Sequence, residues 1–73
     1  MANSIFTFKA CLCLMGQGDE LVPYDTAHIE AASEADAVRL SKQWARDAAM
    51  SDDSYLQVLQ GGKAVARLGP AEF

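Results

Sequence analysis

The first apolar segment of the chain alternates with a period of two. Between residues 5 and 15, the odd positions mix polar and apolar side chains, and Cys11 and Cys13 are among them. The even positions are uniformly apolar: Phe6, Phe8, Ala10, Leu12 and Leu14. Such alternation predicts a strand that is half-covered by a core, with the even face turned inward.

A second alternating run covers residues 26–32, where Ala27, Ile29 and Ala31 are separated by polar side chains. It predicts a strand antiparallel to the first, reached through a long loop. That loop contains glycines and Pro23, and proline cannot donate a ladder hydrogen bond within a central strand. In the hairpin we expect Leu12 to lie opposite Ile29, which would place His28 across from Cys13.

The next segment has the period of an amphipathic helix. Ser33 suits the N-cap position, and the chain from there to about Met50 contains neither glycine nor proline. At 100° per residue, one face gathers Ala37, Leu40, Ser41, Trp44, Ala45 and Ala48. We expect the centre of the core to be Trp44, packed against Phe6, Phe8, Leu12, Leu14 and Ile29.

Two more β-like runs flank Gly61-Gly62. A type I′ turn needs positive φ at both central residues, which glycine adopts without strain. The two-residue turn predicts three pairs: Leu59 with Ala64, Val58 with Val65, and Tyr55 with Leu68. The pattern leaves open which face of this second hairpin is buried and whether the two hairpins join in one sheet.

The element order is therefore ββαββ. We predict one domain over residues 1–73, of the α+β class, with an antiparallel four-stranded sheet packed on one amphipathic helix. The order and the helix sequence A-S-E-A-D-A-V-R-L-S-K-Q-W-A-R-D-A-A resemble a family of small uncharacterised bacterial domains with this hairpin–helix–hairpin plan. The S-E-A-D-A segment at residues 33–37 also resembles the helix start of HicB-type antitoxin domains, which would imply a regulatory partner protein. The P-D-L-P-G segment of that group and its DNA-binding tail are missing.

Composition and charge narrow the classes of partner. The chain has 73 residues, 51% of them hydrophobic, and a formal net charge of -4. A negative chain is a poor match for nucleic acid or an anionic membrane surface. The opening apolar run is broken by Lys9, whereas a membrane span needs about 18 unbroken apolar residues. No charged n-region of a secretory signal precedes this run, so we expect a cytoplasmic protein with reduced thiols.

Three side chains form a candidate metal site. In the expected register Cys11, Cys13 and His28 share one face, and thiolates with an imidazole suit zinc. The alternative is that both cysteines are small apolar filler and that His28 is a polar surface residue rather than a general base. With one histidine and no strong nucleophile motif, we expect a protein that is not an enzyme.

One helix can cover only one face of the sheet, and the odd face of the first strand is largely apolar. We expect that face to be an interface, formed by Ile5, Cys11, Cys13 and Met15. A two-fold homodimer is the commonest way to cover such a surface. The sequence thus predicts a small interaction module that pairs with itself. A metal- or ligand-binding protein that uses Cys11, Cys13 and His28, or an antitoxin-like partner protein, is the alternative.

Overall fold

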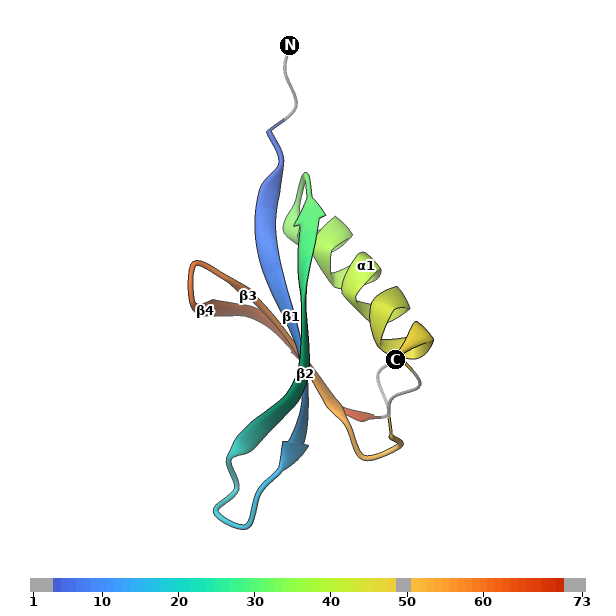
Figure 1. Cartoon of the computed structure of the whole chain (residues 1–73). Coiled ribbons are helices and arrows are strands. Elements are labelled where there is room, and N and C mark those ends of the chain that lie inside the picture. Colours follow the sequence, from blue (N-terminus) through green and yellow to red (C-terminus); the bar gives the residue numbers. More distant parts are fainter. Residues whose placement is uncertain (1–3, 49–50, 71–73) are drawn as a thin grey trace.

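Four strands and one helix make up the structure, a computed structural model that describes residues 4–48 and 51–70 (Figure 1). The elements are β1 (Phe6–Met15), β2 (Leu21–Ala31), α1 (Glu34–Asp47), β3 (Tyr55–Gln60) and β4 (Lys63–Leu68). The strands form one antiparallel sheet in the order β2-β1-β3-β4. The predicted α+β class and the ββαββ order are confirmed, and pairing between β1 and β3 joins both hairpins in that sheet.

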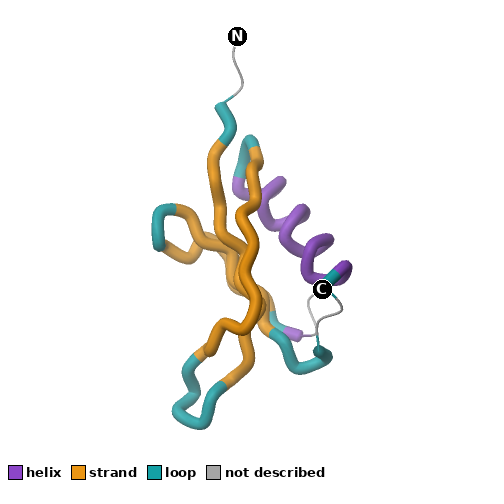
Figure 2. The backbone as a smooth tube through the Cα atoms, in the orientation of Figure 1, coloured by secondary structure: helices purple, strands orange, loops and turns teal. Residues whose placement is uncertain are grey.

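The helix α1 lies against one face of the sheet (Figure 2). It begins at the predicted N-cap, where the Ser33 hydroxyl accepts a hydrogen bond of 3.2 Å from the Asp36 backbone N–H. It ends at Asp47, earlier than the sequence predicts, and Met50 lies outside the described residues. Within the described ranges, no helix has the length and apolar character needed to span a membrane.

Small side chains set the distance between α1 and the sheet. Ala37, Ser41 and Ala45 are spaced four residues apart, and each has no exposed surface. This narrow stripe lets the helix backbone approach the strands closely, which leaves no room for a large ring at the centre. The prediction that Trp44 is the centre of the core is therefore wrong, because Trp44 is half-buried at the margin of the core.

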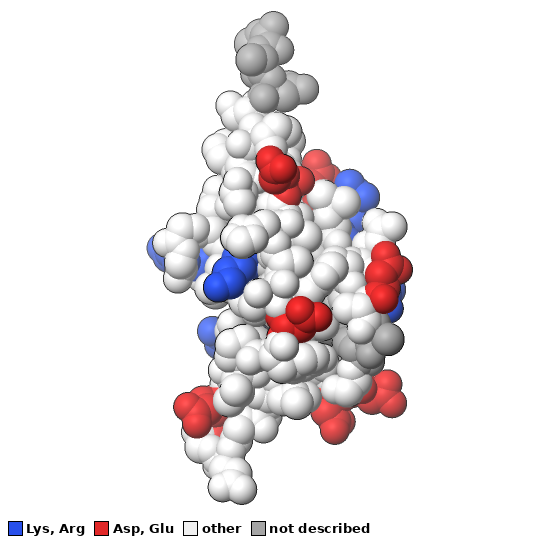
Figure 3. Space-filling model, viewed as in Figure 1, with Lys and Arg blue, Asp and Glu red and all other residues white. Residues whose placement is uncertain are grey.

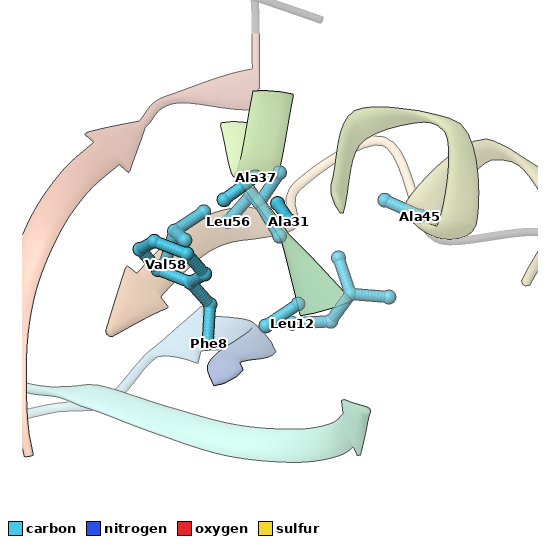
Figure 4. Packing of buried hydrophobic residues seen from close by; sticks show 8 residues of the cluster. Phe8, Leu12, Ala31, Ala37, Ala45, Leu56 and Val58 are labelled. Carbon is cyan, nitrogen blue, oxygen red and sulfur yellow. The ribbon is translucent and has the colours of Figure 1, made fainter. Parts of the chain in front are cut away.

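The core itself follows the even face of β1, as predicted for its middle. Figure 4 shows Phe8 beside Val58, with Leu12 and the helix alanines nearby. The buried cluster is Phe8, Ala10, Leu12, Ala31, Ala37, Ala45, Leu56 and Val58. Two predicted core residues are wrong, since Phe6 and Leu14 are exposed and lie near opposite ends of β1, and Ile29 is half-buried. At about 1.5 Å per residue the helix is shorter than a ten-residue strand at about 3.3 Å per residue, so it cannot cover both ends.

The hairpin β1–β2 is longer than predicted and has a different register. The strand β2 begins at Leu21 and includes Pro23, which an edge strand tolerates. Ile29 pairs with Phe8 rather than with Leu12. Leu12 pairs with Asp25 and Cys13 with Pro23, so Tyr24 is an extra residue in a β-bulge.

A second bulge changes the predicted register of β3–β4. Gly61 and Gly62 have φ of 62° and 82°, and the turn holds Leu59 opposite Ala64 as predicted. Beyond that pair Val65 is the extra residue, so the predicted pairs of Val58 with Val65 and of Tyr55 with Leu68 are wrong. The bulge places Arg67 opposite Gln57. In an unbroken ladder Arg67 would oppose Leu56, which has no exposed surface, and its charge would enter the core.

Candidate functional site

Cys11 and Cys13 lie on the sheet face opposite α1, yet both are buried. Their exposed fractions are 6% and 1%. Across the two ladders, the partners of Cys11 are Thr26 and Gln57, and those of Cys13 are Pro23 and Tyr55. Opposed residues share a face, so these four side chains flank the thiols on the sheet face that α1 does not cover. Both cysteines lie on the predicted outer face, and each is buried within the single chain.

The environment of the two thiols favours their protonated form. Burial raises the pKa of Cys11, and nearby Lys9 lowers it by a smaller amount. Burial also raises the pKa of Cys13, with a further rise from Cys11 and a smaller opposing effect from Arg67. The Cys13 Sγ lies 3.8 Å from the Cys11 carbonyl oxygen, to which the thiol donates a weak hydrogen bond. Neither sulfur is in a disulfide.

The structure places His28 away from the expected position beside Cys13. His28 pairs with Lys9, because the register of β1–β2 is shifted from the expected one. It is exposed on the same face as the cysteines, diagonal to Cys11. In the described part of the chain, no three histidine, cysteine or acidic side chains come together as a metal-binding group. A zinc site at Cys11, Cys13 and His28 stays a prediction.

The two other side chains of the predicted interface are exposed. Ile5 precedes β1 and Met15 ends it, so they lie at opposite ends of this strand. Between them the uncovered face carries a polar band that includes Lys9, His28 and Gln57. The predicted apolar patch is thus divided, and one of its ends continues into a larger apolar surface.

That larger surface is the hairpin arm, by which we mean residues 14–24. It comprises the end of β1, the turn, and the start of β2, and it extends past the helix in Figure 1. β3 pairs with β1 only from Lys9 to Cys13, so among the described strands only β2 accompanies the end of β1. Within residues 4–48 and 51–70, the arm is therefore a two-stranded ribbon with no third strand beside it.

Both faces of the hairpin arm carry apolar side chains. Leu14 pairs with Val22 on the face that α1 covers elsewhere, and Met15 pairs with Leu21 on the other face. The exposed fractions of its largest uncovered side chains are 40% for Leu14, 46% for Met15, 49% for Val22 and 47% for Tyr24. Together with Ile5 and Phe6, these are the large exposed hydrophobic side chains of the described residues. The arm therefore holds most of that exposed apolar surface.

Hydrogen bonds fix the base of the hairpin arm. The Tyr24 hydroxyl hydrogen-bonds the Ser54 hydroxyl, which in turn lies 2.9 Å from the Ser51 hydroxyl. Tyr24 belongs to β2 and Ser54 immediately precedes β3, so the bond spans the intervening strand β1. Ser54 has no exposed surface. The bulge at Tyr24 thus directs a long side chain toward the start of β3.

A hollow of about 470 Å³ lies where the hairpin arm meets the body of the protein. Its walls are Leu14, Met15, Asp53, Tyr55 and Pro70. Volumes of roughly 300–1,000 Å³ are typical of sites that hold a small molecule or a large side chain. The Asp53 carboxylate beside the apolar side chains of Leu14, Met15 and Pro70 makes this hollow suited to an occupant with an aliphatic part and a positive end.

The charged side chains of the hairpin arm and of the loop before β3 are all negative, and the cation close enough to affect the pKa of Cys13, at the base of the arm, is Arg67. Asp19 and Glu20 are exposed on the turn of the arm, and Asp25 is exposed just past its base. Asp52 and Asp53 are exposed on the loop before β3. The six lysines and arginines of the chain lie elsewhere: Lys9, Arg39, Lys42, Arg46, Lys63 and Arg67. In Figure 3 the lower end of the molecule, where Figure 1 places the β1–β2 turn, shows red and white atoms without blue.

Sequence reasoning places Met15 at this surface and allows Tyr24, as an exposed loop aromatic, to contact a ligand or a partner. It misses Leu14 and Val22. Leu14 has the parity of a core residue, and Val22 and Tyr24 fall in the segment predicted to be a loop. The signal that could have revealed them is the length of the first strand. The alternation of β1 continues past the point that a helix of 14 residues can cover, so the end of the strand must be uncovered.

Comparisons of the chain with known protein families, curated proteins and solved structures find no match.

Proposed function

We propose that the protein is a non-enzymatic interaction module that binds another polypeptide through its hairpin arm. The observation that supports this proposal is the exposure of Leu14, Met15, Val22 and Tyr24 on a ribbon whose two faces are both uncovered. A contiguous exposed apolar patch on a small protein is typical of a binding surface.

An isolated two-stranded ribbon gains stability when a partner buries its exposed apolar side chains. A two-stranded hairpin is at best marginally stable in water without further packing. The four exposed side chains present roughly 300 Å² of surface, so their burial at about 25 cal/mol/Å² contributes on the order of 7 kcal/mol before association costs. A standard interface covers about 800 Å² on each partner. The turn and the hollow beside the arm supply adjoining area for a contact of that size.

A second copy of the chain is the partner that the sequence predicts, and homodimer formation stays a prediction. The burial of Cys11 and Cys13 lowers the apolar area that the uncovered sheet face can offer to such a pair. The hairpin arm is accordingly a better-supported place for binding than the middle of that face.

Site-specific photocrosslinking in the native cells tests this proposal. A benzophenone amino acid replaces Val22 on the arm in one variant, and it replaces the exposed Gln43 on the far side of α1 in a matched variant. We expect a discrete protein adduct from position 22 and none from position 43. The mass of the adduct distinguishes a second copy from another protein.

The proposal is wrong if position 22 gives no adduct, or if both positions give the same ones. Circular dichroism of both purified variants verifies that each retains the fold, because both substituted side chains are exposed in the wild type.

A further inference from the structure

We infer that the partner of the hairpin arm is a polypeptide segment that is both apolar and basic. This inference rests on the proposed function, since it names the chemistry of the partner for the same surface. It follows from how the charges of the chain are distributed around the exposed apolar side chains and from the composition of the hollow.

The first step is the separation of charge along the molecule. Five exposed carboxylates border the arm: Asp19, Glu20, Asp25, Asp52 and Asp53. Residues 10–38 contain no lysine or arginine, and neither does the loop before β3. An apolar surface surrounded by one sign of charge attracts a partner of the opposite sign and repels one of the same sign.

The second step concerns self-association. In a two-fold dimer the same patch meets itself, so an arm-to-arm contact would bring two such sets of carboxylates together. Like charges facing each other across an interface are unfavourable. A second copy is therefore a poorer occupant of this surface than a basic chain.

The third step is the hollow at the base of the arm. Leu14, Met15 and Pro70 provide apolar walls, and Asp53 provides a carboxylate. A lysine or arginine side chain can lay its aliphatic stem along apolar walls while its charged end meets a carboxylate. The ring of Tyr55 adds a surface on which a cation can also lie. The hollow therefore suits a basic anchor residue, with the apolar side chains of the same segment on Leu14 and Val22.

Two designed probe peptides test this inference against the wild-type full chain. Both are amphipathic helices with the same leucine face, and the polar positions are all lysine in one and all glutamate in the other. A third peptide has the lysine composition in scrambled order, without an apolar face. Fluorescence anisotropy gives each Kd at physiological ionic strength, and amide chemical shifts locate the contact.

We expect the lysine peptide to bind at least roughly tenfold more tightly than both other peptides. The shift changes should fall on residues 14–24 and 51–55. Asp52→Asn combined with Asp53→Asn should weaken binding roughly fivefold, as expected for the loss of two rim charges. The matched control combines Glu34→Gln with Asp47→Asn on α1, which removes the same charge from exposed helix positions and should leave Kd unchanged.

Four results would overturn the inference. Equal binding of the glutamate peptide would mean that only the apolar side chains matter, and the proposed function would survive with a partner of other chemistry. Equal binding of the scrambled peptide, or equal weakening by the helix control, would mean unspecific attraction to a negative protein. Absence of any arm contact by every peptide would overturn the inference alone, whereas absence of crosslinks from position 22 overturns the proposed function as well.

Discussion

The hydroxyl groups of Tyr24 and Ser54 hydrogen-bond to each other across β1, between the two strands that flank it. Tyr24 is the bulged residue of β2, and Ser54 lies buried at the entrance to β3. The bond therefore connects the base of the hairpin arm to the second hairpin. Because the arm lacks a third strand, this connection limits how far it can swing relative to the body.

Tyr24→Phe removes that hydrogen bond and leaves the ring in place. We expect the free energy of unfolding in urea to fall by about 1 kcal/mol, since a buried hydroxyl then loses a partner. Ser51→Ala is the matched control, because Ser51 contacts the same Ser54 hydroxyl but belongs to neither strand. A Tyr24→Phe protein as stable as wild type would show that this bond contributes nothing to the fold.

The two buried thiols predict a fall of stability at alkaline pH. Burial raises the pKa of Cys11 and of Cys13 above the ordinary value of 9.0. The folded state then holds these two protons more tightly than the unfolded state. The two thiols therefore leave the free energy of unfolding unchanged well below pH 9 and lower it as the pH rises above 9. Urea denaturation between pH 7 and about 10.5 measures the slope.

Cys13→Ala isolates the contribution of one thiol to this pH dependence. The variant loses packing at every pH, so its free energy of unfolding is lower throughout. The quantity to compare with wild type is the slope of that free energy against pH. We expect a shallower decline above pH 9 than in wild type. Parallel curves would contradict the assignment of the effect to Cys13.

Ser41 offers a stabilising substitution under α1. Its Oγ is buried, and among the described residues it has no hydrogen-bond partner. Ser41→Ala removes an unsatisfied polar atom and introduces a better helix former, so we expect the free energy of unfolding to rise by about 1 kcal/mol. Thermal and urea denaturation measure the change. Ala45→Ser, one helical turn further along the same stripe, should lower stability by a similar amount, and a loss in both variants would count against this account of Ser41.

The secondary-structure elements were predicted well from the sequence, because each element depends on residue types within a short segment. The parity of β1, the Ser33 cap and the Gly61-Gly62 turn each depend on a few neighbouring residues, and the structure agrees with all three. Pairing between β1 and β3 brings together strands far apart in the chain, and the sequence left that pairing open.

The candidate site was harder to predict, because it depends on what each element fails to cover. Periodicity assigns Leu14 to the core face, but its exposure is decided by where α1 ends. It likewise places Cys13 on the outer face, where flanking side chains bury it. The bulges at Tyr24 and Val65 shift parity by one residue without a distinctive residue type, so turn chemistry alone could not reveal them.

The residue without a partner at Val65 allows the length of β4 to change at one point without changing the rest of its ladder. With Val65 deleted, Ala66 would follow Ala64 directly, and Ala66, Arg67 and Leu68 would keep their present partners in a ladder without a bulge. A relative whose last strand is one residue shorter at this point should therefore present the same side chains to the helix-covered face, and Ala66 and Leu68, which pack against the core, should stay apolar.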